Sequence, residues 1–334
     1  MTWSLRNVGD PEELVMGATP DHWPRLTREE IVRHAPNASI VARDGEQLVA
    51  RCSLWWSDVP ALEGHRLGAI GHFAADDADA AQAILAESCR QLQAAGCSLA
   101  VGPMDGNTWR RYRLVVDPGT EPAFFLEPTN PAAWPEYFTT AGFSALANYT
   151  SGVNRDLSIR DPRVEELETR FASRGITLRP LNVTEFEEEL ARIYSVAAVS
   201  FRPNFLYTPI AEAEFAAQYG AVRGVVVPEL VLLAEDAGRT VGFTFCLPDL
   251  LEKQRTGTLR TAIIKTFAVL PERERYGGLG SLMADRIHRT AQAMGLSRVI
   301  HALMHETNRS KSISDRTGST IRRYALFARE LSAG

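Results

Sequence analysis

Three glycines and an arginine stand close together in ERERYGGLGSL (272–282), where an apolar run ends and helical spacing begins. Gly278 and Gly280 permit a close approach of the backbone to a ligand. The first amide groups of a helix lack partners within it, and the helix dipole favours an anion there. The stretch therefore predicts a phosphate or pyrophosphate site on this backbone: Arg275, Tyr276, Gly277, Gly278, Leu279, Gly280 and Ser281.

Two other phosphate-binding motifs do not fit this stretch. A P-loop needs a Lys-Ser/Thr pair after its last glycine, and no such pair follows Gly280. A dinucleotide fingerprint needs a G-x-G-x-x-G run with an acidic residue about 20 positions further on. On the motif alone, a glycine-rich turn between a strand and a helix, without any ligand, remains an alternative.

A strand, a helix and a second strand must position these residues, and the same unit occurs twice in the chain. Each unit has an amphipathic helix that ends at a glycine suited to a helix C-cap. The two units run from RLGAIGHF (66–73) to CSLAVGPM (97–104), and from RTAIIKTF (260–267) to LSRVIHALM (296–304).

The two units differ where the phosphate site is predicted. The second unit is five residues longer, and the additional residues fall in the glycine-rich stretch. The first unit has ADDADA (75–80) instead, whose carboxylates would repel phosphate oxygens. We therefore expect only the second half of the chain to bind a phosphorylated ligand.

The bulk properties limit the classes of protein to consider. A net charge of -5 argues against general nucleic-acid binding. Four scattered cysteines show no metal-ligand spacing, so no metal is expected. The sequence begins without the features of a signal peptide and has no apolar run of about 18 residues. A cytoplasmic protein that spans no membrane is expected.

The 334 residues are enough for two domains. In each half a helical stretch and a hairpin signal precede the repeated unit, and a short helix, a glycine and a last strand follow it. The pattern predicts the α/β (α+β) class, with two tandem domains that each contain a mixed, mostly antiparallel sheet flanked by helices. The predicted domains are 1–156 and 176–334, and the charged segment 157–175 is the predicted helical connector.

Strand IKTFAVLP, the R-x-x-G-x-G turn, the amphipathic helix and the strand RVIHALM resemble motif A and the segment after it in the GCN5-related N-acetyltransferase (GNAT) superfamily. The resemblance covers most of 176–330, and a weaker copy covers 1–156. The chain as a whole resembles a tandem GNAT protein with a degenerate N-terminal domain. The resemblance implies a sheet whose fourth and fifth strands splay apart around an acyl-thioester donor, usually acyl-CoA.

The same resemblance implies where the donor lies. Its pantetheine arm would pair with the fourth strand around Phe267, Ala268 and Val269, and its pyrophosphate would lie on 275–281. Asn308 matches an asparagine that lies near the pantetheine in the family. The acceptor would lie on the following residues, for which core aromatics and a proline-rich turn are the alternative: Phe201, Asn204, Phe205, Tyr207, Phe245 and Asp249.

The catalytic residues are less clear from the resemblance. The family often uses a tyrosine four residues before a glycine as the general acid, and Ser314 stands at that distance from Gly318. Either the general acid is absent, which a thiolate leaving group would tolerate, or Ser314, a water or Tyr324 replaces that tyrosine. His305 and Glu306, at the end of the fifth strand, are the candidate general bases, and a surface or structurally bonded histidine is the alternative for His305.

The leading hypothesis is an acyltransferase that moves an acetyl or other acyl group from acyl-CoA to an amine or hydroxyl of a small molecule by direct attack on the thioester. A second hypothesis keeps the fold but takes the acyl group from phosphopantetheine on an acyl carrier protein. The arginines of 109–113 or of 322–323 could meet such an acidic partner. A third, suggested by the missing tyrosine, is a regulatory protein that binds acyl-CoA without catalysis.

Overall fold

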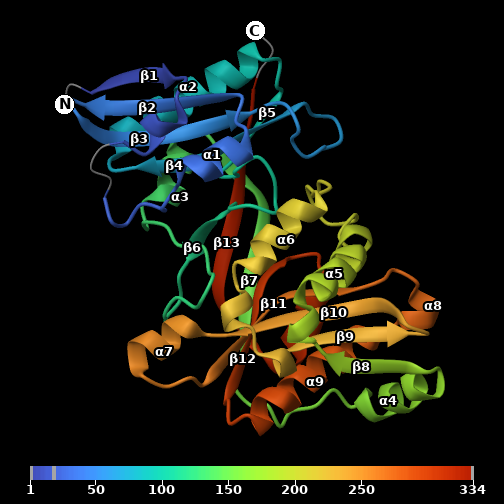
Figure 1. Cartoon of the computed structure of the whole chain (residues 1–334). Coiled ribbons are helices and arrows are strands. Elements are labelled where there is room, and N and C mark those ends of the chain that lie inside the picture. Colours follow the sequence, from blue (N-terminus) through green and yellow to red (C-terminus); the bar gives the residue numbers. More distant parts are fainter. Residues whose placement is uncertain (1–2, 17–19, 332–334) are drawn as a thin grey trace.

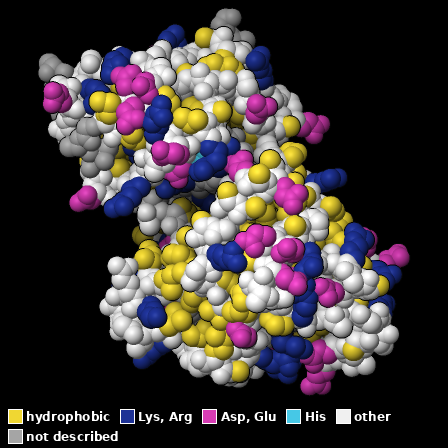
Figure 2. Space-filling model, in the orientation of Figure 1, with side chains coloured by type: hydrophobic (Ala, Val, Ile, Leu, Met, Phe, Trp, Pro, Cys, Tyr) yellow, Lys and Arg dark blue, Asp and Glu magenta, His cyan; other side chains and the backbone are white. Residues whose placement is uncertain are grey.

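The computed structural model describes residues 3–16 and 20–331, so the extreme ends of the predicted domains, 1–2 and 332–334, lie outside the described residues. Within these ranges, thirteen strands form one continuous mixed sheet. Figure 1 shows two lobes, one from each half of the chain, joined by long strands. In the space-filling view the molecule narrows between the lobes (Figure 2).

The described part of the first half supplies seven strands and three α-helices. The strands are β1 (Ser4–Val8), β2 (Ala38–Asp44), β3 (Gln47–Trp55), β4 (Leu67–Ala75), β5 (Leu99–Gly102), β6 (Leu114–Asp117) and β7 (Ser144–Asn154). The helices are η1 (Pro11–Leu14), which is a 3-10 turn, and α1 (Arg28–His34), α2 (Ala78–Ala94) and α3 (Trp134–Thr140).

The described part of the second half supplies six strands and seven α-helices. The strands are β8 (Ile176–Pro180), β9 (Val231–Asp236), β10 (Arg239–Pro248), β11 (Thr261–Val269), β12 (Arg298–His305) and β13 (Ser319–Glu330). The α-helices are α4 (Val164–Ser173), α5 (Phe186–Ser200), α6 (Glu212–Gly220), α7 (Leu250–Thr256), α8 (Arg273–Tyr276), α9 (Leu279–Ala293) and α10 (Arg309–Thr317). The 3-10 turns are η2 (Val183–Glu185), η3 (Arg223–Val225) and η4 (Pro228–Leu230).

The fold class and the repeated strand–helix–strand unit are confirmed. β4, α2 and β5 form the first copy, and β11, α9 and β12 form the second, each with a parallel strand pair. α9 buries an apolar stripe that includes Leu279, Leu282 and Ile287 against the sheet. α5 and α6 cover the other face, since Phe243 contacts Phe201 while Gly242 faces Met283 of α9. No helix in the described part of the chain is both long and apolar enough to cross a membrane.

The last strand of each half pairs with the other half. β7 has its partners in β12 and β13, both from the second half, and β13 has its partners in β5, β6 and β7, all from the first. Figure 1 shows β7 and β13 side by side where the lobes meet. The division into 1–156, 157–175 and 176–334 remains a prediction that follows chain order, whereas strand pairing crosses it.

Apolar contacts also join the two halves. Phe124 and Val153 from the first half form a buried cluster with Ile263, Ile300 and Ile321 from the second. Ile263 and Ile300 belong to β11 and β12, the parallel strand pair of the second unit. The two lobes therefore share part of their core, which fixes the walls of the space between them.

Candidate active site between the two halves

The splay between β11 and β12 creates the first cavity. The two strands pair only from Thr261 to Ile264 and from Arg298 to His301, and then separate as the resemblance implied. The gap, here called the inter-strand cavity, has a volume of about 140 Å³. It is lined by Phe201, Ile264, Lys265, Thr266, Phe267, Ala284, His301, Ala302, Leu303, Met304, Asn308 and Ile313.

A second cavity of about 650 Å³, here called the inter-lobe cavity, opens between the halves. Its walls come from regions of both halves that are distant in sequence. The first half supplies 108–113, 126–129 and Tyr149, and the second half supplies part of 201–222, the strand residues around 245–247 and 265–266, and Leu303, His305 and Asn308.

The two cavities meet at one point. Five residues line both of them, and we call this set the junction: Phe201, Lys265, Thr266, Leu303 and Asn308. A donor in one cavity and an acceptor in the other would have their reactive atoms together at the junction.

Two backbone irregularities aim side chains at the junction. Phe245 pairs with Thr266 and Cys246 with Ile264, so Lys265 is the extra residue of a β-bulge in β11. Leu303 has a φ of 58°, which is rare for a leucine. Its N–H donates to Ser151 Oγ at 3.0 Å, where the register between β12 and β7 shifts. Both strands thus leave regular pairing at the same place.

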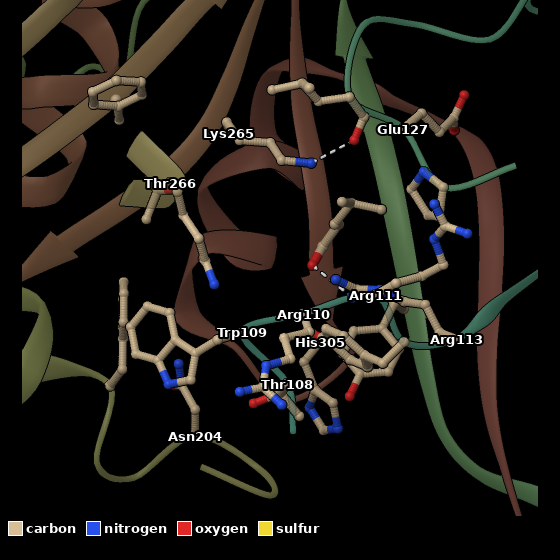
Figure 3. Close-up of a pocket in the computed structure, with 18 of the residues that line it drawn as sticks. Thr108, Trp109, Arg110, Arg111, Arg113, Glu127, Asn204, Lys265, Thr266 and His305 are labelled. Carbon is tan, nitrogen blue, oxygen red and sulfur yellow. Dashed lines mark hydrogen bonds between the residues drawn. The ribbon is translucent and has the colours of Figure 1, made fainter. Parts of the chain in front are cut away.

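Lys265 is the charged group at the junction. Its ammonium donates to the carbonyl oxygen of Leu126 at 2.7 Å (Figure 3). Burial, and then the charge of Arg113, lower the pKa of Lys265 from 10.5 to about 7, although Glu127 acts in the opposite direction. An amine that titrates near neutral pH can accept or return a proton there.

The segment 118–130 crosses from the first half to the sheet of the second and carries Leu126 to Lys265. Glu127 is nearly fully buried and accepts hydrogen bonds from Arg322 at 2.9 and 3.2 Å and from the Tyr324 hydroxyl. Arg322 also donates to the carbonyls of Pro118, Glu121 and Pro122. This buried pair holds the segment in place.

His305 lies in the wall of the inter-lobe cavity. Its ring stacks on Phe205 and meets Tyr149 edge-on, with ring centroids 5.4 and 5.0 Å away. Its Nδ1 lies 2.8 Å from Thr307 Oγ1. Burial lowers the pKa of His305 below its usual value, so the ring is neutral at pH 7 and able to accept a proton.

The glycine-rich turn forms the start of α9. Gly278 has a φ of 92°, and a Cβ added there would come within 2.6 Å of Leu167 in α4. A Cβ added at Gly280 would come within 2.5 Å of the Phe267 ring, which lines the inter-strand cavity. The close approaches explain both glycines and connect the turn to that cavity.

The side chain of Arg275 is engaged within the protein. Its guanidinium forms a bidentate pair with Asp236, with the shorter contact 2.5 Å long, and is 58% exposed. Arg170 of α4 and Arg174, the residue that caps its C-terminus, donate to backbone carbonyls of the same turn. The predicted connector is thus packed against the turn, and Arg163 approaches Ser281 Oγ at 3.4 Å.

The corresponding helix of the first half starts differently. The carboxylate of Asp77 accepts a hydrogen bond from the N–H of Ala80 at 2.7 Å and caps α2. A carboxylate therefore lies where the second half offers free amide groups.

Five of the six predicted acceptor residues line the inter-lobe cavity: Phe201, Asn204, Phe205, Tyr207 and Phe245. Asp249 does not, because its carboxylate caps α7 and accepts from the N–H of Phe125 at 2.9 Å. Among the predicted donor residues, Phe267 and Asn308 line the inter-strand cavity. Ala268 is buried in β11, and the carbonyl of Val269 accepts from Ser200.

The structure does not bring Ser314 or Tyr324 to the junction. Ser314 is buried beside Gly152 of β7, and Tyr324 is buried with its hydroxyl 3.0 Å from Ser151 Oγ and bonded to Glu127. Their catalytic roles remain predictions.

The basic and aromatic segment 109–113 has two interpretations from its sequence, a contact between the two domains or a surface for a partner. Trp109 packs against Phe201 and donates to the carbonyl of Thr208 at 2.8 Å, so the segment forms a contact between the halves. Arg110 pairs with Glu214 at 3.0 Å. The contact between the halves is thus the interpretation that the structure supports, whereas the residues that the segment contacts could not be predicted from local pattern.

No protein-family model and no curated protein sequence matches the chain. Solved structures do match over nearly its whole length. A tandem GNAT protein from the clavulanic acid biosynthesis pathway has a TM-score of 0.52 at 13% identity, with all of both chains covered. A GCN5-related N-acetyltransferase from Sphaerobacter thermophilus has a TM-score of 0.50 at 14% identity, covering 99% of this chain and 96% of that one.

A third match is the GCN5-related glucosamine N-acetyltransferase region of a fungal multi-domain GH3 β-N-acetylglucosaminidase. It has a TM-score of 0.55 at 13% identity and covers 98% of this chain but only 38% of the fungal one. The described chain therefore has a tandem GNAT fold. At these identities the likeness concerns the fold, and the activity must be argued from the site.

Proposed function

We propose that the protein transfers an acyl group from acyl-CoA to an amine, or a hydroxyl, of a small molecule. The observation that carries the proposal is the meeting of two cavities at the junction, beside a lysine that titrates near neutral pH. The inter-strand cavity suits the narrow pantetheine arm, and the inter-lobe cavity suits the acceptor.

The turn at the start of α9 fits the phosphates of the donor. The amide groups of Gly278 to Ser281 belong to the first turn of the helix and have no acceptor within it. Gly280 brings this turn against Phe267, so a donor arm in the inter-strand cavity has its phosphate end near the turn. In the first half, the Asp77 cap disfavours the same ligand.

The chemistry at the junction is an addition followed by an elimination. The acceptor nitrogen forms a bond to the thioester carbonyl carbon, the carbon–sulfur bond breaks, and the sulfur leaves as a thiolate. The nitrogen must lose a proton, and neutral Lys265 can hold that proton on Nζ and return it to the thiolate. His305, in the wall of the inter-lobe cavity, is the second candidate base.

Binding of CoA and release of free thiol from acetyl-CoA test the proposal. Gly280→Ala places a methyl group against Phe267, so we expect CoA affinity to fall about tenfold or more, which corresponds to about 1.4 kcal/mol. Calorimetric titration of CoA and a thiol-release assay over an amine panel measure the two effects. Gly224→Ala is the control, because nothing lies within 4 Å of its added Cβ.

Three outcomes would contradict the proposal. CoA binding that Gly280→Ala leaves unchanged would exclude the turn as the phosphate site. Tight CoA binding without thiol release on any amine would favour the non-catalytic alternative. If the unaltered protein transfers the acyl group from an acylated carrier protein but not from acyl-CoA, the carrier-dependent enzyme is favoured. Of the two basic clusters suggested for a carrier, the one at 322–323 has Arg322 buried.

A further inference from the structure

The inter-lobe cavity carries an excess of positive charge. Its lining includes four permanently or partly charged cations, Arg110, Arg111, Arg113 and Lys265, and one carboxylate, Glu127. Arg110 is neutralised by Glu214, with which it pairs at 3.0 Å. Glu127 is the one carboxylate of the lining that could neutralise Arg111, Arg113 or Lys265.

The carboxylate of Glu127 is already engaged by other groups of the protein. Its two carboxylate oxygens accept from Arg322, from the Tyr324 hydroxyl and from the N–H of Phe124 at 3.2 Å. Arg322 is itself buried and has no other carboxylate within ion-pair distance among the described residues. The described ion pair of Glu127 is therefore with Arg322, and Glu127 forms no described ion pair with Arg111, Arg113 or Lys265.

Arg113 is a buried cation without a carboxylate among the described residues. It is 8% exposed and its guanidinium lies between the rings of Tyr112 and Tyr149, with centroids 3.9 and 4.3 Å away. The only described hydrogen bond of the guanidinium is a donation to the carbonyl of Leu303 at 3.3 Å, and its Nε is buried without a partner among the described atoms. Burying a charge with unused donors is costly unless a ligand completes the site.

Arg111 stands beside it with its guanidinium unused. No described residue forms a hydrogen bond or an ion pair with this side chain, which is exposed. It lines the inter-lobe cavity and also an adjoining cavity of about 490 Å³ between the first half and α6. Figure 3 shows Arg110, Arg111 and Arg113 entering the space from one segment, opposite Lys265.

The adjoining cavity is unsuited to a cation. His34, His72 and Asp105 come within 4.8 Å of one another there, a spacing that a metal ion could use. Arg51, Arg110 and Arg111 lie close enough to act on these groups, and burial together with their charges lowers the pKa of His72 to about 3. The positive field that opposes protonation of His72 also opposes a metal cation and favours an anion.

We propose that the acceptor is an anionic amine, a small molecule that carries both the reactive amino group and a carboxylate or phosphate group. The anionic group binds Arg111 and Arg113, whose planar donors suit two oxygens of either group, and the nitrogen reaches the junction at Lys265. This inference rests on the proposed acyl transfer and adds the class of substrate.

The test uses matched acceptors with the full-length protein. Amino acids, ω-amino acids and aminoalkyl phosphates are each compared with the neutral amide or alcohol of the same length. Because charged hydrogen bonds contribute about 1.5–3 kcal/mol, we expect kcat/KM to favour the best anionic acceptor over its neutral analogue by about 10- to 100-fold. Arg111→Gln and Arg113→Gln should reduce that ratio to near unity. Arg90→Gln, which removes a surface charge paired with Glu87, should keep it.

Calorimetric titration of the same acceptors without any acyl donor separates the two proposals. Anionic acceptors that bind in an Arg111-dependent manner would support the site even if no acyl transfer were detected. Arg111→Gln decides the matter if the buried Arg113→Gln variant fails to fold, since Arg111 is exposed. Equal use of charged and neutral acceptors, no binding of any anionic acceptor, or a preference that Arg111→Gln leaves intact, would overturn the inference.

Discussion

Lys265 illustrates how one residue acquires a chemical role from its surroundings. The β-bulge in β11 turns its side chain into the junction, and Leu126 accepts a hydrogen bond from its ammonium. A lysine in water keeps its proton until pH 10 or so. The burial that lowers this pKa to about 7 makes the neutral amine available under ordinary conditions.

Lys265→Met should lower kcat/KM by about 100-fold, the usual size of a lost general base. In the unaltered protein kcat/KM should rise with pH through about 7, because the folded-state pKa is depressed and the reactive neutral form exists above it. The variant should lack this rise. The measurement is a pH profile of kcat/KM with one acceptor.

His305→Gln is the matched control for this pH profile. If Lys265 is the base, the rise near pH 7 survives in His305→Gln, whatever its effect on KM. A profile that is unchanged in Lys265→Met and lost in His305→Gln would assign the base to His305 instead, as the sequence suggested.

The burial of Lys265 was predictable from the sequence, but its lowered pKa was not. It is the one charged residue in the apolar run IIKTFAVLP, which a strand pattern would place on a buried surface. Its hydrogen-bond partner Leu126 lies 139 residues earlier, in the other half of the chain. A pKa that depends on such a distant contact cannot be read from local sequence.

At the scale of elements, the segment 118–130 connects the halves through one buried ion pair. Arg322 and Glu127 have side chains that are 6% and 1% exposed. The carbonyl contacts of Arg322 to this segment fix the backbone that carries Leu126 to Lys265. Stability and the position of the catalytic candidate are therefore coupled.

Arg322→Met should lower the free energy of unfolding by about 3–5 kcal/mol, because it leaves the Glu127 carboxylate buried without its cation. Glu127→Gln combined with Arg322→Met should cost less than Arg322→Met alone, since no charge then remains buried. Urea unfolding followed by circular dichroism measures both.

Arg155→Met is the control: Arg155 pairs with Glu121 of the same segment but is 49% exposed, so its loss should cost under about 1 kcal/mol. If Arg322→Met and Arg155→Met lowered the free energy of unfolding equally, this account would be contradicted.

The local elements of the site were predictable because their causes are local. The glycine pattern, the amphipathic helix and the C-cap glycine all act within a few residues, and the turn, α9 and Gly295 lie where they were expected. Asn308 lies at the junction for the same reason, since it stands in the short turn between β12 and α10. The side chain of Arg275 differs from the expectation, because Asp236 on β9 holds it.

At the scale of the whole molecule, the pairing of β7 and β13 was beyond local reasoning. Both are long strands that follow a short helix, and either could complete the sheet of its own half. The structure pairs each with strands of the opposite half, and with each other. Alternation of apolar residues specifies which face of a strand is buried, but not which neighbour it joins.

This exchange predicts that neither half folds alone. A fragment of residues 1–156 would contain β7 without either of its partners, and a fragment of 157–334 would contain β13 without any of its three. Each fragment would also expose a long unpaired edge and half of the cluster around Phe124.

Produced separately, the fragments should aggregate or lack a cooperative thermal transition. Produced together, they should associate into a complex of one copy each that restores CoA binding, measured by size-exclusion chromatography with light scattering and by calorimetry. Two soluble, independently folding monomers would show that the lobes are autonomous and that the shared strands are not required to build the site.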